Sequence, residues 1–199
     1  IGQYGGTWRT ALRGGADNAW LLRTMDYEYL VRWDPDWTKV IPNLAESFEA
    51  NEDATEFTFH LRKGVKWSDG EPFTADDIMF WYEDVFMNEE LTPVKTSWLV
   101  TGDEPVTVEK IDDYTLKFKF AAPAPLLADR LAMWPNGVVA EKVVVPKHYL
   151  IQFHPDYSDE YDDFTTFDEK LDWRVNPECS VLNPWRPIKH EPGARLILE

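Results

Sequence analysis

Five side chains of this sequence have the chemistry of metal ligands or nucleophiles. They are four histidines and a single cysteine: His60, His148, His154, His190 and Cys179. Zinc sites place such residues at short, fixed spacings, as in H-x-H or H-E-x-x-H, and no such spacing occurs here. The sequence also lacks the G-x-S-x-G turn of serine hydrolases, and nothing beside Cys179 marks it as a nucleophile. We therefore expect no metal, no cofactor and no catalytic residue.

Carboxylates offer a second type of chemistry. Adjacent pairs occur at Asp76-Asp77, Glu89-Glu90 and Asp112-Asp113, each at an expected helix start, loop or hairpin turn. A glycosidase needs two acids that converge across a cleft, and a sequence this acidic contains adjacent pairs by chance. Residues 155–172 hold eight acids, a pattern typical of a solvated, mobile surface, although calcium also binds clustered carboxylates. We predict that the protein is not an enzyme, and calcium binding by this run stays open.

The ten tryptophans are the better functional clue. Trp20, Trp134 and Trp185 lie beside Gly, Pro and Asn in expected loops, where aromatic faces can line a pocket. The alternative is that they close the edge of a subdomain. Other tryptophans, among them Trp67 and Trp81, lie in apolar patterns and are expected in the core.

Composition excludes several classes of partner. The 199 residues are 44% hydrophobic and carry a formal net charge of −16, enough apolar residues for a core and the wrong charge for nucleic acid or anionic lipid. No run reaches the roughly 18 apolar residues of a membrane span. No basic, apolar leader is visible, and the single cysteine excludes a disulfide within the chain.

Residues 57–86 predict a strand, a turn and a capped helix in succession. Apolar and polar residues alternate from Phe57 to Leu61, the period of a half-buried strand. Ser68-Asp69-Gly70 indicates a turn, and Thr74 lies three residues before Asp77, as in a capping box. The following residues place an apolar stripe at α-helical spacing: Ile78, Trp81, Tyr82 and Val85. A second alternation, from Val106 to Phe120, predicts a hairpin that turns at Asp112-Asp113.

The same region resembles a known family. Residues 61–80, LRKGVKWSDGEPFTADDIMF, closely resemble the signature of the family 5 extracellular solute-binding proteins, the oligopeptide- and dipeptide-binding type of ABC importers. Four further segments resemble motifs of this family in the same order: YEYL at 27–30, PNLAES at 42–47, IDDYTL at 111–116 and VPKHY at 145–149. The final strand, 194–199, also resembles the family, but the preceding turn reads LNPW instead of G-T-G-P-Y.

The resemblance implies an α/β (mixed α+β) fold, a lobe like that of type II periplasmic binding proteins, with a mixed sheet and an inserted α+β subdomain. Residues 1–26 and 148–199 would form parts of lobe I, and residues 27–147 the insert that carries the signature. Family members are considerably longer, so the chain resembles an amino-terminal fragment, with lobe II expected beyond Glu199.

The resemblance also implies a transport role in the periplasm or on the extracellular face of the membrane. The partners would be an oligopeptide and the transmembrane subunits of an ABC permease, and a lipid anchor on the precursor is compatible with it. The loop before YEYL offers backbone groups to the ligand in this family, which suggests Asp17, Asn18, Ala19 and Trp20 as ligand-binding residues, together with Trp134 and Trp185. An oligosaccharide is the alternative solute. From another class, an acidic protein-interaction domain without a solute is a third reading.

Overall fold

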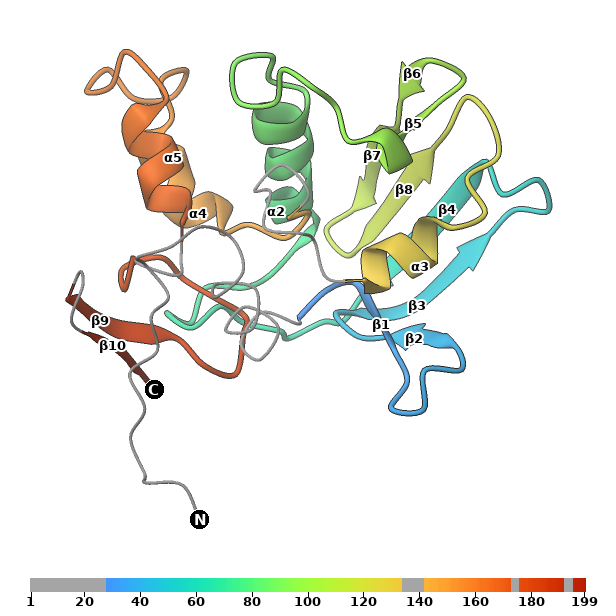
Figure 1. The fold of residues 1–199 in the computed structure, drawn as a ribbon, viewed down its shortest axis with the longest axis horizontal. Helices are drawn as coiled ribbons and strands as arrows, with labels where there is room; N and C mark the ends of the chain where they lie inside the picture. The colour runs from blue at the N-terminus through green and yellow to red at the C-terminus, as the bar shows by residue number, and fades with distance from the viewer. Residues whose placement is uncertain (1–27, 134–141, 173–175, 192–194) are drawn as a thin grey trace.

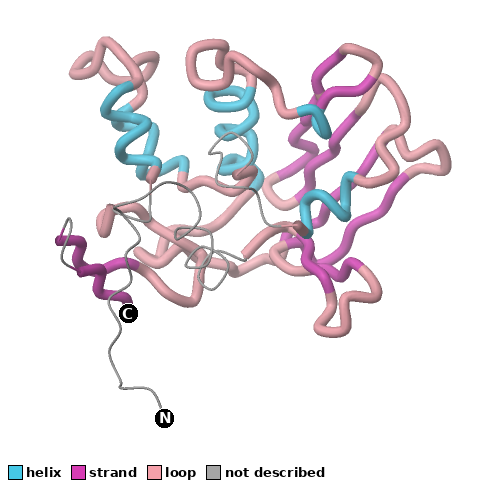
Figure 2. Tube along the Cα trace, viewed as in Figure 1, coloured by secondary structure: helices cyan, strands magenta, loops and turns pink. Residues whose placement is uncertain are grey.

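The computed structural model describes residues 28–133, 142–172, 176–191 and 195–199 (Figure 1). Within these ranges helices and strands are combined, which confirms the mixed composition expected from the sequence, and all the strand pairs are antiparallel. The strands are β1 (Val31–Trp33), β2 (Val40–Pro42), β3 (Ala45–Ala50), β4 (Glu56–Leu61), β5 (Val100–Thr101), β6 (Glu104–Pro105), β7 (Thr107–Asp112), β8 (Thr115–Lys119), β9 (Pro187–Glu191) and β10 (Arg195–Leu198). The helices are α2 (Ala75–Phe80), η1 (Trp81–Phe86), η2 (Ser97–Leu99), α3 (Leu127–Ala132), α4 (Lys147–Leu150), η4 (Ile151–Phe153) and α5 (Thr165–Leu171). Figure 2 shows most strands on one side of the molecule and α4 and α5 on the other.

A four-stranded antiparallel sheet, in the order β3-β4-β8-β7, supplies much of the core. The alternation predicted for residues 57–61 is confirmed, because Phe57 and Phe59 are buried whereas His60 is exposed. The rings of Phe59 and Phe118 meet edge to face with centroids 5.4 Å apart, a geometry that adds to the stabilisation from burial. The predicted hairpin is confirmed as β7 and β8.

Helix α2 begins with the predicted capping box. The Thr74 side chain caps the first turn, and the Asp77 carboxylate accepts a hydrogen bond from the backbone N–H of Thr74. The α-helical spacing was expected to continue, but the next six residues form the π-helix η1. A π-helix aligns residues five positions apart, and Trp81 and Phe86 stack with centroids 5.3 Å apart, both fully buried. These two large rings therefore share one face that α-helical geometry would have divided.

Strands β1 and β2 form a hairpin that turns at Asp34-Pro35-Asp36, and these two short strands were not predicted from the sequence. The carboxylate of Asp34 accepts hydrogen bonds from Thr38 N and Thr38 Oγ1, each over 2.6 Å, and from Lys39 N over 3.3 Å. Trp37 follows the turn with φ at 56°. The tip of this hairpin is thus fixed by one side chain.

The segment after residue 142 packs on the helical side, with α4 against both α2 and α5 (Figure 1). The acidic run holds α5, whose acids are exposed as expected while Phe167 and Leu171 are buried. His154 is fully buried, and the centroids of the Phe164 and Phe167 rings lie 4.9 and 5.1 Å from its own. At the end of the chain β10 confirms the predicted final strand, whereas its partner β9 was not predicted. None of the described helices is both long and apolar enough to cross a membrane.

Candidate functional site

Of the six residues predicted to bind ligand, the structure describes one. Asp17, Asn18, Ala19, Trp20 and Trp134 lie outside the described residues. Trp185 lies in the loop before β9, with 51% of its surface exposed. The proposed ligand site therefore remains a prediction.

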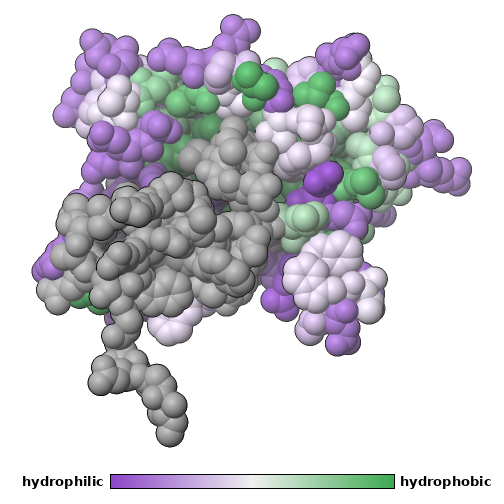
Figure 3. Space-filling model, viewed as in Figure 1, coloured by the Kyte–Doolittle hydropathy of each residue, from purple (hydrophilic) through white to green (hydrophobic). Residues whose placement is uncertain are grey.

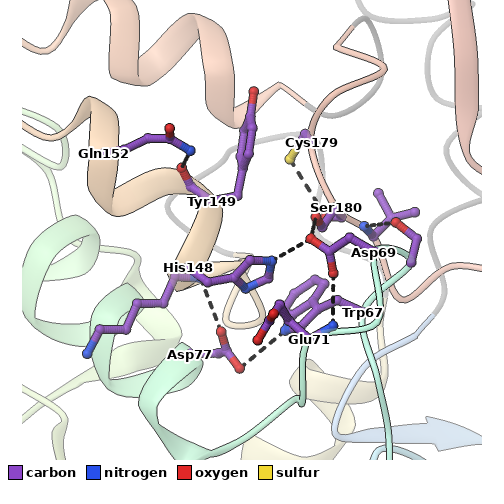
Figure 4. Close-up of polar contacts among 12 residues, drawn as sticks. Trp67, Asp69, Glu71, Asp77, His148, Tyr149, Gln152, Cys179 and Ser180 are labelled. Carbon is purple, nitrogen blue, oxygen red and sulfur yellow. Dashed lines mark hydrogen bonds and ion pairs between the residues drawn. The ribbon is translucent and has the colours of Figure 1, made fainter.

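The described residues do bring the signature loop, residues 67–77, together with later parts of the chain. Asp77 is the centre of this contact and is only 4% exposed. Its Oδ1 accepts a hydrogen bond from Lys147 N over 3.1 Å, and its Oδ2 accepts from the indole Nε1 of Trp67 over 3.3 Å (Figure 4). The same Oδ2 also accepts from Thr74 N over 3.0 Å. Burial raises the pKa of Asp77 above its ordinary value, although the three donors oppose that effect.

Asp69 makes a second, more exposed set of contacts. Its Oδ2 accepts a hydrogen bond from Ser180 Oγ and lies 2.8 Å from His148 Nε2, while its Oδ1 accepts from Glu71 N over 3.1 Å (Figure 4). Partial burial would raise the pKa of Asp69, but the hydrogen bonds outweigh it, so the pKa lies below its ordinary value. The ring of His148 also lies against Trp67, with centroids 5.9 Å apart.

Ser68 continues the attachment through the backbone. Its N–H donates to the carbonyl oxygen of Val181 over 2.9 Å, and its Oγ accepts from Val181 N over 3.2 Å. We use the term signature joint for Trp67, Asp69, Asp77, His148 and Ser180. Two separate stretches, around residues 147–148 and 180–181, are thereby fixed to one loop.

The signature joint contains the residue types of a serine hydrolase, but not their connections. In a catalytic triad the histidine lies between the serine and the carboxylate. Here Ser180 and His148 both contact the same oxygen of Asp69, so the imidazole does not face the hydroxyl. The neighbouring thiol is equally unsuited, because burial raises the pKa of Cys179 to about 12. The signature joint therefore holds segments of the chain together, and its side chains are not placed as a nucleophile and its base would be.

No metal site appears among the residues that the structure describes, because their His, Cys, Asp and Glu side chains form no suitable group of three or more. The prediction that Trp67 lies in the core is confirmed, since it is 4% exposed. The pairing of Asp69 with His148 was missed. Both residues belong to segments that resemble family motifs, but 79 positions separate them and nothing local indicates contact.

The sequence model of the bacterial extracellular solute-binding proteins, family 5 middle, matches residues 39–199. This chain belongs to that family. The match covers the signature loop and both stretches attached to it, and it confirms the resemblance found in the sequence. As a family 5 member, the protein belongs to the periplasm or the extracellular face of the membrane.

Family 5 relatives with different solutes are similar to this chain. The periplasmic alpha-galactoside-binding protein of Rhizobium meliloti (strain 1021) is 32% identical over 171 residues, which cover 85% of this chain and 23% of the relative. The dipeptide-binding protein of Escherichia coli (strain K12) is 39% identical over 122 residues, covering 54% of this chain and 22% of the relative.

Solved structures show the same two kinds of neighbour. The oligopeptide-binding protein OppA has a TM-score of 0.81 and 37% identity, and the match covers 100% of this chain and 32% of that protein. MelB from Agrobacterium fabrum C58, solved in complex with stachyose, has a TM-score of 0.66 and 31% identity, covering 94% of this chain and 27% of MelB. The chain therefore spans less than a third of the length of each of these relatives.

Proposed function

We propose that the protein is the solute-binding component of an ABC importer, which captures oligopeptides by closure of two lobes and delivers them to a permease. The observation that supports oligopeptides is the similarity to an oligopeptide-binding protein over the whole chain, at a TM-score of 0.81. In this proposal no bond is made or broken. The solute stabilises the closed form, which the permease recognises, by binding it more tightly than the open form.

The proposed organisation assigns residues 1–26 and 148–199 to the first lobe and 27–147 to an inserted subdomain. A second lobe would follow Glu199. Hydrogen bonds of the signature joint cross the proposed boundary, from Asp69 to His148 and to Ser180. They support an insert that moves with the first lobe as one body during closure.

An oligosaccharide is the second candidate solute. It is favoured by the alpha-galactoside-binding relative, whose alignment covers 85% of this chain. A peptide would need a carboxylate for its amino group, for which Asp17 is our candidate. A sugar would instead need aromatic faces, for which Trp20, Trp134 and Trp185 are the candidates.

A thermal-shift experiment on the intact protein tests both solutes. Pools of oligopeptides and of small oligosaccharides are added, and a solute at 100 times its Kd should stabilise the native state by about 2.7 kcal/mol. A shift with peptides alone supports the first candidate, and a shift with sugars alone supports the second. Absence of a shift with either pool would contradict both.

Substitutions connect the shift to the predicted site. For a peptide solute, Asp17→Asn should reduce the shift, whereas for a sugar solute Trp185→Ala should reduce it. Tyr157→Ala is the matched control, because Tyr157 is an aromatic residue exposed to a similar extent as Trp185 but is not among the predicted ligand-binding residues. If the control reduced the shift as much as the site variants, the assignment of the site would be wrong.

A further inference from the structure

Trp37 adopts a backbone conformation that its side chain disfavours. Its φ is 56°, in the left-handed region where glycine is the usual residue and a bulky residue is an outlier. The position follows a turn with Pro35 in its second place, where a glycine commonly completes a hairpin loop. A tryptophan at this position costs backbone strain.

The same side chain is also costly because it is exposed. Trp37 is 73% exposed, and neither Trp37 nor Trp33 belongs to the hydrophobic core or packs against it. Apart from its contact with Trp33 on the same hairpin, this ring fills no space between elements. Strain that the fold does not require is characteristic of functional positions.

The ring is nevertheless held in one place. Trp33 stacks on Trp37 with centroids 6.2 Å apart and ring planes 21° from parallel. The backbone beneath is fixed by the Asp34 carboxylate, which accepts three hydrogen bonds from Thr38 and Lys39. Since Trp33 covers one face of Trp37 and the residue is still 73% exposed, the opposite face is open to solvent. The result is a preorganised aromatic platform, for which little ordering is needed on binding.

The loop that carries this platform has polar residues of both charges. Asp36, Thr38 and Lys39 are exposed on the same loop as Trp37, so the loop offers donors and acceptors without a dominant charge. In Figure 3 the part of the surface over β1 and β2, at the lower right, shows pale residues of intermediate hydropathy between hydrophilic ones. A cation or an anion would be selected by a single sign of charge, which is absent here. An uncharged ligand ring with an apolar face and a rim of hydroxyl groups matches both the aromatic face of Trp37 and the polar loop around it.

We propose that the Trp37 platform is a carbohydrate-binding surface that stacks on a pyranose unit of a polysaccharide. The surface is open, so it suits one unit of a long chain that two closing lobes cannot enclose. It lies on the inserted subdomain and is independent of which solute the protein captures. Its role would be to hold the protein near a glycan.

Affinity electrophoresis of the intact protein in gels that contain soluble polysaccharides tests this proposal. A panel of starch, galactomannan, xylan and dextran is the probe, and at least one polymer should retard the wild type. Trp37→Ala should weaken the retardation about fivefold or more, as expected for the loss of one stacked ring. Tyr157→Ala, which removes an exposed aromatic ring outside the predicted ligand-binding residues, should leave it unchanged.

Trp37→Gly separates binding from folding. Glycine accepts the left-handed conformation, so this variant should unfold at the wild-type temperature or higher and yet lose the retardation. Migration of the wild type unaffected by every polymer, or equal retardation of Trp37→Gly and wild type, would overturn the proposal. Neither result bears on the thermal shift with small solutes, so the two proposals can fail separately.

Discussion

The sheet β3-β4-β8-β7 and the signature joint are stabilised in different ways. In the sheet, apolar side chains such as Phe59 and Phe118 are removed from water, and their contribution follows the buried area. In the signature joint, buried Asp77 depends on three particular N–H groups. The sheet should therefore tolerate apolar substitutions of similar volume, whereas the signature joint should not tolerate the change of a single atom.

The largest effect is expected in the sheet. Phe59→Ala removes a fully buried ring at the centre of the core and should lower the free energy of unfolding by about 3–5 kcal/mol. Urea denaturation followed by circular dichroism measures it. Ile111→Ala, at a 57% exposed position on β7, is the control and should change little. A loss below that of other core truncations would mean that the sheet is not the main core.

Asp77→Asn is the corresponding test of the signature joint. The amide keeps the shape of the carboxylate but turns one acceptor into a donor that faces an N–H group, which should cost about 2–3 kcal/mol. Asp76→Asn is the matched control, since Asp76 is half-exposed and pairs with Lys110 on the surface. Equal stability of the two variants would show that burial, not hydrogen bonding, holds this loop.

The pH dependence of stability should distinguish the two carboxylates of the signature joint. The pKa of Asp69 lies below its ordinary value of 3.8, so its contribution is present above pH 3.8 and is lost as the pH falls through the lowered pKa. The pKa of Asp77 is raised, so the native state binds this proton before the unfolded state does, and acidification favours the native state.

Asp69→Asn should cost about 1 kcal/mol at neutral pH, because Asp69 is partly exposed. Denaturation of wild type and variants at several pH values between about pH 6 and about pH 3 measures the trend. The difference between wild type and Asp69→Asn should shrink with acidification, and the difference for Asp77→Asn should grow. Parallel curves would mean that neither pKa is shifted by folding.

The smallest effect concerns a surface contact of the helical side. Tyr157 donates a hydrogen bond to Asp84 over 2.9 Å, and this bond raises the pKa of Tyr157 to about 12. Tyr157→Phe should cost about 0.5 kcal/mol, since the tyrosine is 55% exposed. Ultraviolet titration of the phenol checks the pairing directly, and Asp84→Asn should lower that pKa toward its ordinary value of 10.0.

Local features of the fold were predictable from the sequence. The strand at Phe57, the turn at Asp69 and the capping box at Thr74 depend on residues a few positions apart. The π-helix was not predictable, because the apolar stripe of Ile78, Trp81 and Val85 has α-helical spacing. The left-handed backbone conformation of Trp37 was not predictable either, because such positions are usually identified in a sequence by the presence of a glycine.

For the candidate site, long-range pairing was the obstacle. The sequence identified the signature and the segment around His148 separately, but the contact between His148 and Asp69 depends on how the whole chain folds back. The ligand-binding residues Asp17, Asn18, Ala19, Trp20 and Trp134 remain predictions, as does the role of Trp185.

The signature joint also has a consequence for the order of folding. Asp69 and Ser180, which share a hydrogen bond, are 111 positions apart, whereas β7 and β8 are joined by a short turn. A contact between residues so far apart in the sequence forms only after a long loop has closed, which costs chain entropy. The sheet should therefore form first. In stopped-flow kinetics, Phe59→Ala should therefore slow refolding, while Asp77→Asn should mainly speed unfolding. A nascent chain released before residue 176 would already possess its sheet and the segment of His148, yet its signature loop would lack the contacts of Ser180 and Val181.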